Sequence, residues 1–259
     1  MTLLHAILLS LIEGITEFLP VSSTGHLIVM AKLLGIETTS FSTSFEIFIQ
    51  LGAILAVVAL YGKSFLRDRA AWVRVAAAFM PTAIVGLALY KMIKETLLTD
   101  PRITVWALFV GGVVLILFEW WHARRMKVAR VATIAQLSWQ KAMVVGLFQS
   151  LSVVPGVSRA AATIVGGLTM GWDRKTAVEF SFFLAVPTML AASGLDLLKS
   201  GASFSGDEIL LLGTGFACSF LVAYVVVKWF VHFIETHTFV QFGVYRILLA
   251  FVMWRLLLT

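Results

Sequence analysis

One segment of the chain, residues 13–26, gathers many of the side chains that could do chemistry, and it reads EGITEFLPVSSTGH. Glu13 and Glu17 lie four residues apart, so on a helix they share one face. Two carboxylates held close in a low-dielectric site repel one another unless a cation or a proton lies between them. The pair therefore suits a divalent metal ion or a general base, because packing alone is a poor reason to bury two charges.

Hydroxyl groups and an imidazole follow the carboxylates in the same segment. Ser22, Ser23 and Thr24 are expected in a loop with Pro20, and His26 comes directly after it. A histidine there could activate a hydroxyl or a water, or protonate a leaving group. Taken singly, such hydroxyls more often bond to backbone carbonyls, and a lone histidine is usually a satisfied polar residue. Their clustering favours a functional site.

A second segment, residues 155–163, reads PGVSRAAAT and complements the first. Arg159 stands beside Ser158, and the small residues behind it predict the start of a helix. A guanidinium at a helix N-terminus forms an anion site. Carboxylates, hydroxyls and a histidine facing such a site fit metal-assisted hydrolysis of a phosphoryl group.

The composition places both segments in a membrane protein. The chain has 259 residues, of which 60% are hydrophobic and only 13% charged, and its mean hydropathy is +0.96. A soluble domain this apolar would have little surface to offer water. A phosphate substrate at membrane depth must be attached to a lipid. The net charge of +6 does not indicate nucleic-acid binding, because the basic residues cluster in short loops, as an orientation signal would.

The elements that must position the two segments can be read from the apolar stretches. We predict an all-α polytopic fold with spans at residues 45–61, 75–93, 103–121, 177–198, 209–231 and 243–258. Shorter apolar arms flank each polar segment, at residues 3–12 and 27–34 and at residues 142–154 and 160–170. Because irregular backbone at membrane depth must be surrounded by protein or a water-filled cavity, each pair of arms predicts a re-entrant helical hairpin.

The order of a hairpin and three spans occurs twice in one membrane domain. The first repeat is residues 1–130 and the second is residues 131–259. Pro20 and Ser23 match Pro155 and Ser158 at one spacing. Because three spans are an odd number of crossings, the second copy must be inverted in the membrane.

The distribution of positive charge predicts the orientation. The first basic loop follows the span at residues 45–61 and the second follows the span at residues 103–121. With these two basic loops in the cytoplasm, six lysines and arginines fall outside and thirteen inside. Those thirteen are Lys63, Arg67, Arg69, Arg74, Arg124, Arg125, Lys127, Arg130, Lys141, Arg174, Lys175, Lys228 and Arg246. The first hairpin then enters from the outer face and the second from the cytoplasm, so that their tips can meet.

The segments EGITEFLPVSSTGHL and PGVSRAAATI, followed by EFSFFLAVP, resemble the undecaprenyl-diphosphate phosphatase family, the bacitracin-resistance proteins of bacterial inner membranes. The resemblance covers nearly the whole chain. The family's ExxxE pair and histidine correspond here to Glu13, Glu17 and His26. Its PGxSRSxxT motif corresponds to Pro155, Gly156, Ser158, Arg159 and Thr163, with Ala160 where the family usually has serine.

The resemblance implies hydrolysis of the diphosphate on the C55 polyprenol carrier to the monophosphate and inorganic phosphate, which recycles the carrier for peptidoglycan and underlies bacitracin resistance. It implies a divalent cation, magnesium or calcium, at Glu13 and Glu17, and a site open to the periplasm. It assigns catalysis to Glu13, Glu17, His26 and Ser23, and substrate binding to Arg159, Ser158, Thr163, Ser22, Thr24 and Gly156. A homodimer is a further expectation. Direct attack by water and a phosphoseryl intermediate both stay open.

The main rival is a transporter or flippase of polyprenyl phosphate, because inverted repeats with broken helices are typical of transporters. A flippase would need the anion site at Arg159, but it has no evident need for a carboxylate pair with a histidine. A scaffold without activity would explain neither polar segment.

Overall fold

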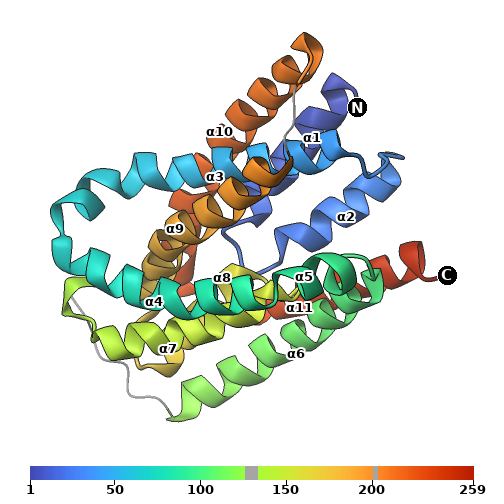
Figure 1. Cartoon of the computed structure of the whole chain (residues 1–259). Coiled ribbons are helices and arrows are strands. Elements are labelled where there is room, and N and C mark those ends of the chain that lie inside the picture. The colour runs from blue at the N-terminus through green and yellow to red at the C-terminus, as the bar shows by residue number, and fades with distance from the viewer. Residues whose placement is uncertain (126–133, 201–203) are drawn as a thin grey trace.

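The computed structural model describes residues 1–125, 134–200 and 204–259, and within these ranges the chain is helical and has no strand (Figure 1). Six of the described helices are long and apolar enough to cross a membrane, and they confirm the predicted fold class. These are α3 (Ser40–Arg67), α4 (Arg69–Ala88), α6 (Pro101–Arg125), α9 (Arg174–Ser200), α10 (Gly206–Thr236) and α11 (Val240–Leu257).

All six long helices begin before the apolar stretches that predicted them, although α4 ends at Ala88 and not at residue 93 as predicted. The first basic loop is almost absent, because α3 continues to Arg67 and α4 begins at Arg69. Only Asp68 separates them, and its carboxylate accepts the backbone N–H groups of Ala70 and Ala71. Such an N-cap satisfies donors that the first turn of a helix leaves free, so the new helix can start at once.

Shorter helices form the two hairpins and the connections. The first hairpin is α1 (Leu3–Thr16) with α2 (Ser23–Leu33), and the second is α7 (Trp139–Ser150) with α8 (Arg159–Thr169). The connecting turns are α5 (Tyr90–Met92), η1 (Ile93–Leu97), η2 (Ile134–Gln136) and η3 (Leu151–Val153). The expectation that Ser23 and Thr24 lie in a loop is wrong, because α2 already begins at Ser23. The chain turns one residue earlier, at Ser22, which has a positive φ of 71°.

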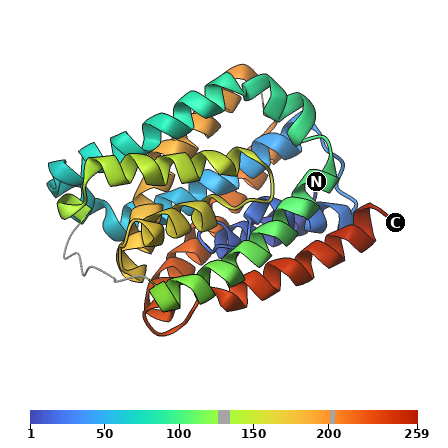
Figure 2. The ribbon, with the colours of Figure 1, turned by 90° about the horizontal axis from the view of Figure 1, so that it is seen from below.

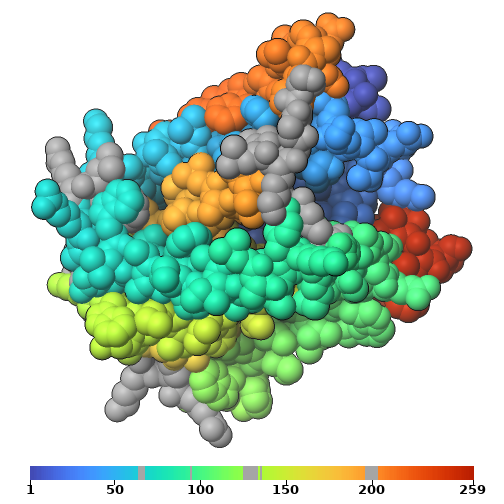
Figure 3. All heavy atoms as spheres, in the orientation of Figure 1, coloured from blue at the N-terminus to red at the C-terminus, as the bar shows by residue number. Residues whose placement is uncertain are grey.

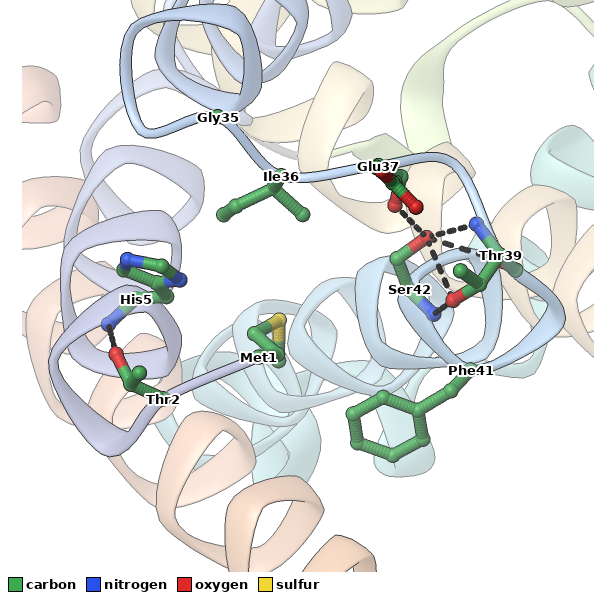
Figure 4. A pocket seen from close by; sticks show the side chains of 9 residues that line it. All are labelled: Met1, Thr2, His5, Gly35, Ile36, Glu37, Thr39, Phe41 and Ser42. Carbon is green, nitrogen blue, oxygen red and sulfur yellow. Dashed lines mark hydrogen bonds between the residues drawn. The ribbon is translucent and has the colours of Figure 1, made fainter.

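The open ends of the two hairpins lie at opposite ends of the molecule. Near the N-terminus, Met1 and His5 face Ile36 and Phe41 across a small cavity, so both ends of the first hairpin meet there (Figure 4). At the other end, the Nζ atom of Lys141 donates to the carbonyl oxygen of Met170 and ties the ends of the second hairpin together. Figure 1 shows the first end at the right and the second at the left. Inverted halves require this arrangement.

Each hairpin packs against a long helix from the other half of the chain. Helix α1 packs against α10, and α7 packs against α4. Glycine allows both close approaches, since a Cβ atom on Gly14 would lie 2.8 Å from the Ser219 carbonyl oxygen and one on Gly146 would lie 2.0 Å from that of Ala78. On the face drawn in Figure 3, α4 lies between α9 and α7. Helices α6 and α11 run side by side, as Figure 2 shows.

One charge lies where the orientation argument did not expect it. Arg246 counts among the cytoplasmic charges in that argument, but it lies within α11 with none of its surface exposed. The count is therefore wrong for this residue. Lys127, Arg130 and the boundary between the predicted repeats at residue 130 lie outside the described residues.

Candidate active site

The two hairpin turns meet, as the sequence analysis expects, and an ion pair joins them. The Nη2 atom of Arg159, the first residue of α8, lies 2.9 Å from Oε1 of Glu17, which ends α1. Both side chains are about nine-tenths buried. Truncating one partner of such a pair strands the other charge away from water, so the contact ties the two turns together.

The second oxygen of Glu17 is also engaged. The hydroxyl of Ser23, in the first turn of α2, donates to Oε2 of Glu17 over 2.6 Å. A hydroxyl within hydrogen-bond reach of a carboxylate has the geometry of a nucleophile beside its general base. Arg159 on the other side fixes the orientation of that base.

Glu13 lies one helical turn before Glu17 and is fully buried. Neither of its carboxylate oxygens has a hydrogen-bond partner among the described residues. A buried carboxylate without partners is costly unless it holds a cation or a proton. Its neighbour Glu17 supplies further oxygen donors, which is the donor type that magnesium and calcium prefer.

The two glutamates therefore fit the divalent cation that the sequence predicts. Within the described ranges no group of three or more histidine, cysteine, aspartate or glutamate residues has metal-binding geometry. Magnesium is commonly held by one or two carboxylates, with water and substrate phosphate oxygens completing its coordination. Glu13 and Glu17 would provide that protein share.

Arg159 is held from behind by residues of α9 and α8. Its Nη1 atom donates to the backbone oxygen and the hydroxyl of Ser181, at 3.0 and 3.2 Å. The hydroxyl of Thr163 lies 2.7 Å from that of Ser181 and is almost fully buried. The Nε atom of Arg159 is buried and has no hydrogen-bond partner in the described structure. Thr163 thus supports Ser181, and through it Arg159.

A cavity of about 560 Å³ opens in front of the joined turns. Both hairpins contribute polar residues to one wall, among them Glu17, Ser22, Ser23, Thr24, Gly156, Ser158 and Arg159. Helices α2 and α8 both begin at this wall, and the N-terminus of a helix attracts anions. Most of the residues that the sequence singled out are therefore brought together, although Glu13, His26 and Thr163 do not line the cavity.

The rest of the cavity is mainly apolar. Its walls come from α4 and α9, with residues such as Ala83, Leu87, Ala191 and Leu195. The lining continues to Leu98, beyond the C-terminal end of α4. An apolar passage that leads away from a charged wall suits a ligand with a phosphate head and a hydrocarbon chain.

His26 points toward α11. Its Nδ1 atom lies 2.7 Å from the carbonyl oxygen of Ser22, and its Nε2 atom lies 2.7 Å from the hydroxyl of Tyr245. Because a carbonyl can only accept, the hydrogen-bond network assigns the proton to Nδ1 and makes Nε2 an acceptor for Tyr245. His26 thus fixes the residue at which the first turn reverses.

Sequence reasoning missed Ser181, Tyr245 and Arg246, all of which hold the site from the second half of the chain. Tyr245 and Arg246 are neighbours in the apolar stretch of residues 243–258, and Ser181 follows Glu179 by two residues in that of residues 177–198. The only signal was that polarity, since in a membrane segment a buried charged residue indicates function by default.

The fold and the site define a class: a polytopic helical membrane protein with a buried arginine beside paired carboxylates. The chain matches the family model described as "Bacitracin resistance protein BacA" over residues 6–252, and it belongs to that family. It is 49% identical over 252 residues to the undecaprenyl-diphosphatase of Aquifex aeolicus, which covers 97% of both chains. It is 50% identical over 250 residues to that of a Sulfurihydrogenibium species, covering 96% of this chain and 97% of the relative. The undecaprenyl-diphosphatase of Wolinella succinogenes is 45% identical over 252 residues.

Proposed function

We propose that this protein is a membrane-embedded phosphatase that hydrolyses undecaprenyl diphosphate to undecaprenyl phosphate and inorganic phosphate. The observation that carries the proposal is the Glu17–Arg159 contact at the charged end of an apolar cavity. The names of the relatives support the same substrate. Such an activity returns the lipid carrier to peptidoglycan synthesis and, like the family description, fits bacitracin resistance.

The polar and apolar walls of the cavity would bind two different parts of the substrate. The terminal phosphate would lie against the N-termini of α2 and α8, where backbone dipoles and the positive charge of Arg159 stabilise its charge. The prenyl chain would follow the apolar walls of α4 and α9. A substrate without that chain would lose the burial of apolar surface that holds it there.

Glu17 and Ser23 provide the reacting groups. Glu17 takes the Ser23 proton as Oγ attacks the terminal phosphorus, and the bond to the bridging oxygen breaks to release the lipid phosphate, which receives that proton. Glu17 then deprotonates a water, which attacks the phosphoserine. Ser23 leaves and regains its proton from Glu17, so the base and the nucleophile are both restored.

Glu13 and Glu17 would hold a divalent cation, magnesium or calcium. A bound cation would neutralise phosphate charge and orient the terminal phosphoryl group. The partnerless carboxylate of Glu13 supports this assignment. Addition of a chelator should therefore remove activity, and either metal at millimolar concentration should restore it.

We infer a site that opens toward the outer, periplasmic side of a bacterial inner membrane. The cavity lining includes Tyr90, Ile93 and Leu98, from the connection that the charge distribution predicts outside. Cysteine labelling in intact cells tests this orientation. Residues 35–44 should react with an impermeant reagent and residues 172–176 should not, and reaction of both regions would disprove the inversion. Native mass spectrometry of the same protein tests the expected homodimer.

The decisive experiment is phosphate release by the purified protein in detergent from undecaprenyl diphosphate, with and without EDTA. We expect one phosphate per lipid, with undecaprenyl phosphate as the other product, and no release by the Glu17→Gln variant. A Glu37→Gln variant, which changes an exposed carboxylate at the end of the molecule, is the matched control. Lipid movement across vesicles without phosphate release would favour the transporter instead.

A further inference from the structure

Arg246 is the one described arginine that is completely buried without a carboxylate partner in the hydrogen bonds of its guanidinium. It lies in the first half of α11, which packs along α6. A buried positive charge is expensive unless its donors are satisfied. The hydrogen-bond partners of these donors indicate what Arg246 does.

All five N–H donors of the Arg246 guanidinium reach backbone carbonyl oxygens, one for each donor. The Nη1 atom donates to Pro20 at 3.3 Å and Val157 at 3.1 Å, and the Nη2 atom donates to Gly156 at 2.8 Å. The other two bonds go to α6, from Nη2 to Ala107 at 3.1 Å and from Nε to Leu108 at 3.5 Å.

Three of those bonds join the two hairpin turns. Pro20 precedes the positive-φ residue Ser22 by two positions, and Gly156 precedes its counterpart Ser158 by two positions. The guanidinium therefore holds corresponding carbonyls of both turns. Carbonyl groups in such turns cannot be left unpaired at membrane depth, so each bond both satisfies and fixes a turn.

We propose that Arg246 is a positioning residue that locks the two turns together and so sets the approach of Glu17 to Arg159. Its guanidinium hydrogen bonds go to backbone carbonyls and to neither of these side chains. Its influence runs through the backbone, because Pro20 lies three residues after Glu17 and Gly156 three before Arg159. Its effect on catalysis rests on the proposed phosphatase activity.

Gly111 provides an independent way to disturb the lock. It lies on α6 against the guanidinium, and a Cβ atom there would come within 2.2 Å of Nη2 of Arg246. Gly111→Ala therefore displaces the guanidinium while every donor is kept. Gly213→Ala in α10 is the matched control, because a Cβ atom at that position meets nothing within 4 Å.

The kinetic test compares Arg246→Met, Arg246→Lys and the exposed control Arg255→Met on the same helix. A misplacement of about 1 Å at a reacting centre can lower the rate on the order of 100-fold, so we expect that loss in kcat for Arg246→Met. The Michaelis constant should change less, because the prenyl chain binds elsewhere. Lysine keeps the charge but has only three donors, so it should rescue part of the rate.

Hydrogen exchange supplies a readout that does not depend on activity. In Arg246→Met and in Gly111→Ala, amides of both turns, residues 17–24 and 154–161, should exchange faster together, whereas Arg255→Met and Gly213→Ala should match the wild type. Should Arg246→Met fail to fold, Arg246→Lys and Gly111→Ala still decide the matter. Wild-type kcat in Arg246→Met or in Gly111→Ala, or faster exchange confined to α11, would overturn the proposal. An inactive wild type would overturn the proposed function alone, since the exchange data still test the lock.

Discussion

The turn between α1 and α2 and the turn between α7 and α8 share a backbone feature but differ in chemistry. In each, the serine that precedes the second helix has a positive φ, 71° at Ser22 and 66° at Ser158. The first turn carries Glu17, whereas the second carries Arg159. Two similar scaffolds thus present opposite charges to one cavity.

That difference explains why one half of the chain would make a poor site. The first turn alone would bring Glu13 and Glu17 together without a fixed positive charge. The second alone would bind phosphate without a base or a metal ligand. Their contact creates a site that neither turn contains, and the following changes test what each contributes.

The largest effect should come from Glu17, whose carboxylate bonds to Ser23 beside the first turn and to Arg159 beside the second. Replacing it with glutamine keeps the shape but removes the base, so we expect kcat/KM to fall on the order of 1,000-fold. Phosphate release at saturating metal is the measurement, with Glu37→Gln as the control. A Glu17→Gln variant within tenfold of the wild type would remove Glu17 from the chemistry.

Arg159 should come next. Lysine keeps the charge but loses the fork that holds Ser181 and Glu17, and one strong charge-assisted bond is worth about 1.5–3 kcal/mol, or roughly ten- to a hundredfold in rate. Alanine should cost more because it also removes the charge. The measurement is kcat/KM at fixed metal, and Arg255→Lys is the control. If Arg159→Lys equals the wild type, the residue supplies only bulk charge.

Variants of His26 and Tyr245 distinguish a catalytic role of His26 from a positioning role. If the histidine acts by fixing Ser22, Tyr245→Phe removes one neutral hydrogen bond and should lower kcat/KM about two- to tenfold without changing the shape of the pH profile. If the predicted acid–base role is correct, His26→Gln should remove one limb of that profile. Full activity of Tyr245→Phe with a lost limb in His26→Gln would favour acid–base chemistry.

The smallest effect concerns the caps of the two turns. The Ser158 hydroxyl accepts the backbone N–H of Ala161 at 3.2 Å, whereas the Ser22 side chain makes no such cap. Ser158→Ala should therefore lower the free energy of unfolding by about 1 kcal/mol more than Ser22→Ala. Denaturation in mixed detergent micelles measures both. Equal losses would show that only the positive φ matters.

Much of this arrangement could be predicted from the sequence. The apolar stretches predicted the six long helices, and the two polar segments predicted that the hairpin tips meet, although the ion pair between Glu17 and Arg159 was not expected. The helix ends were missed because caps such as Asp68 extend helices through charged residues that hydropathy assigns to loops. The repeat was also matched one residue out of register, since Ser158 has its backbone counterpart in Ser22 and not in Ser23.

Arg246 shows a limit of a different kind. A positive charge near the start of an apolar stretch is what an interfacial anchor also looks like. Only the packing of α11 against α6 reveals that its partners are carbonyl groups from turns about 90 and 226 residues away. Backbone carbonyls leave no side-chain signature, so no motif in the sequence could have named them.

The most direct test of the account is whether Glu17 and Arg159 act as one unit. The measurement is kcat/KM for Glu17→Asp, Arg159→Lys and the double variant, with Glu17→Asp combined with Arg255→Lys as the control pair. Residues in contact interact, so the loss in the double variant should differ from the product of the single losses by about threefold or more, whereas the control pair should multiply. Simple multiplication for Glu17 and Arg159 would contradict a single site built from both turns.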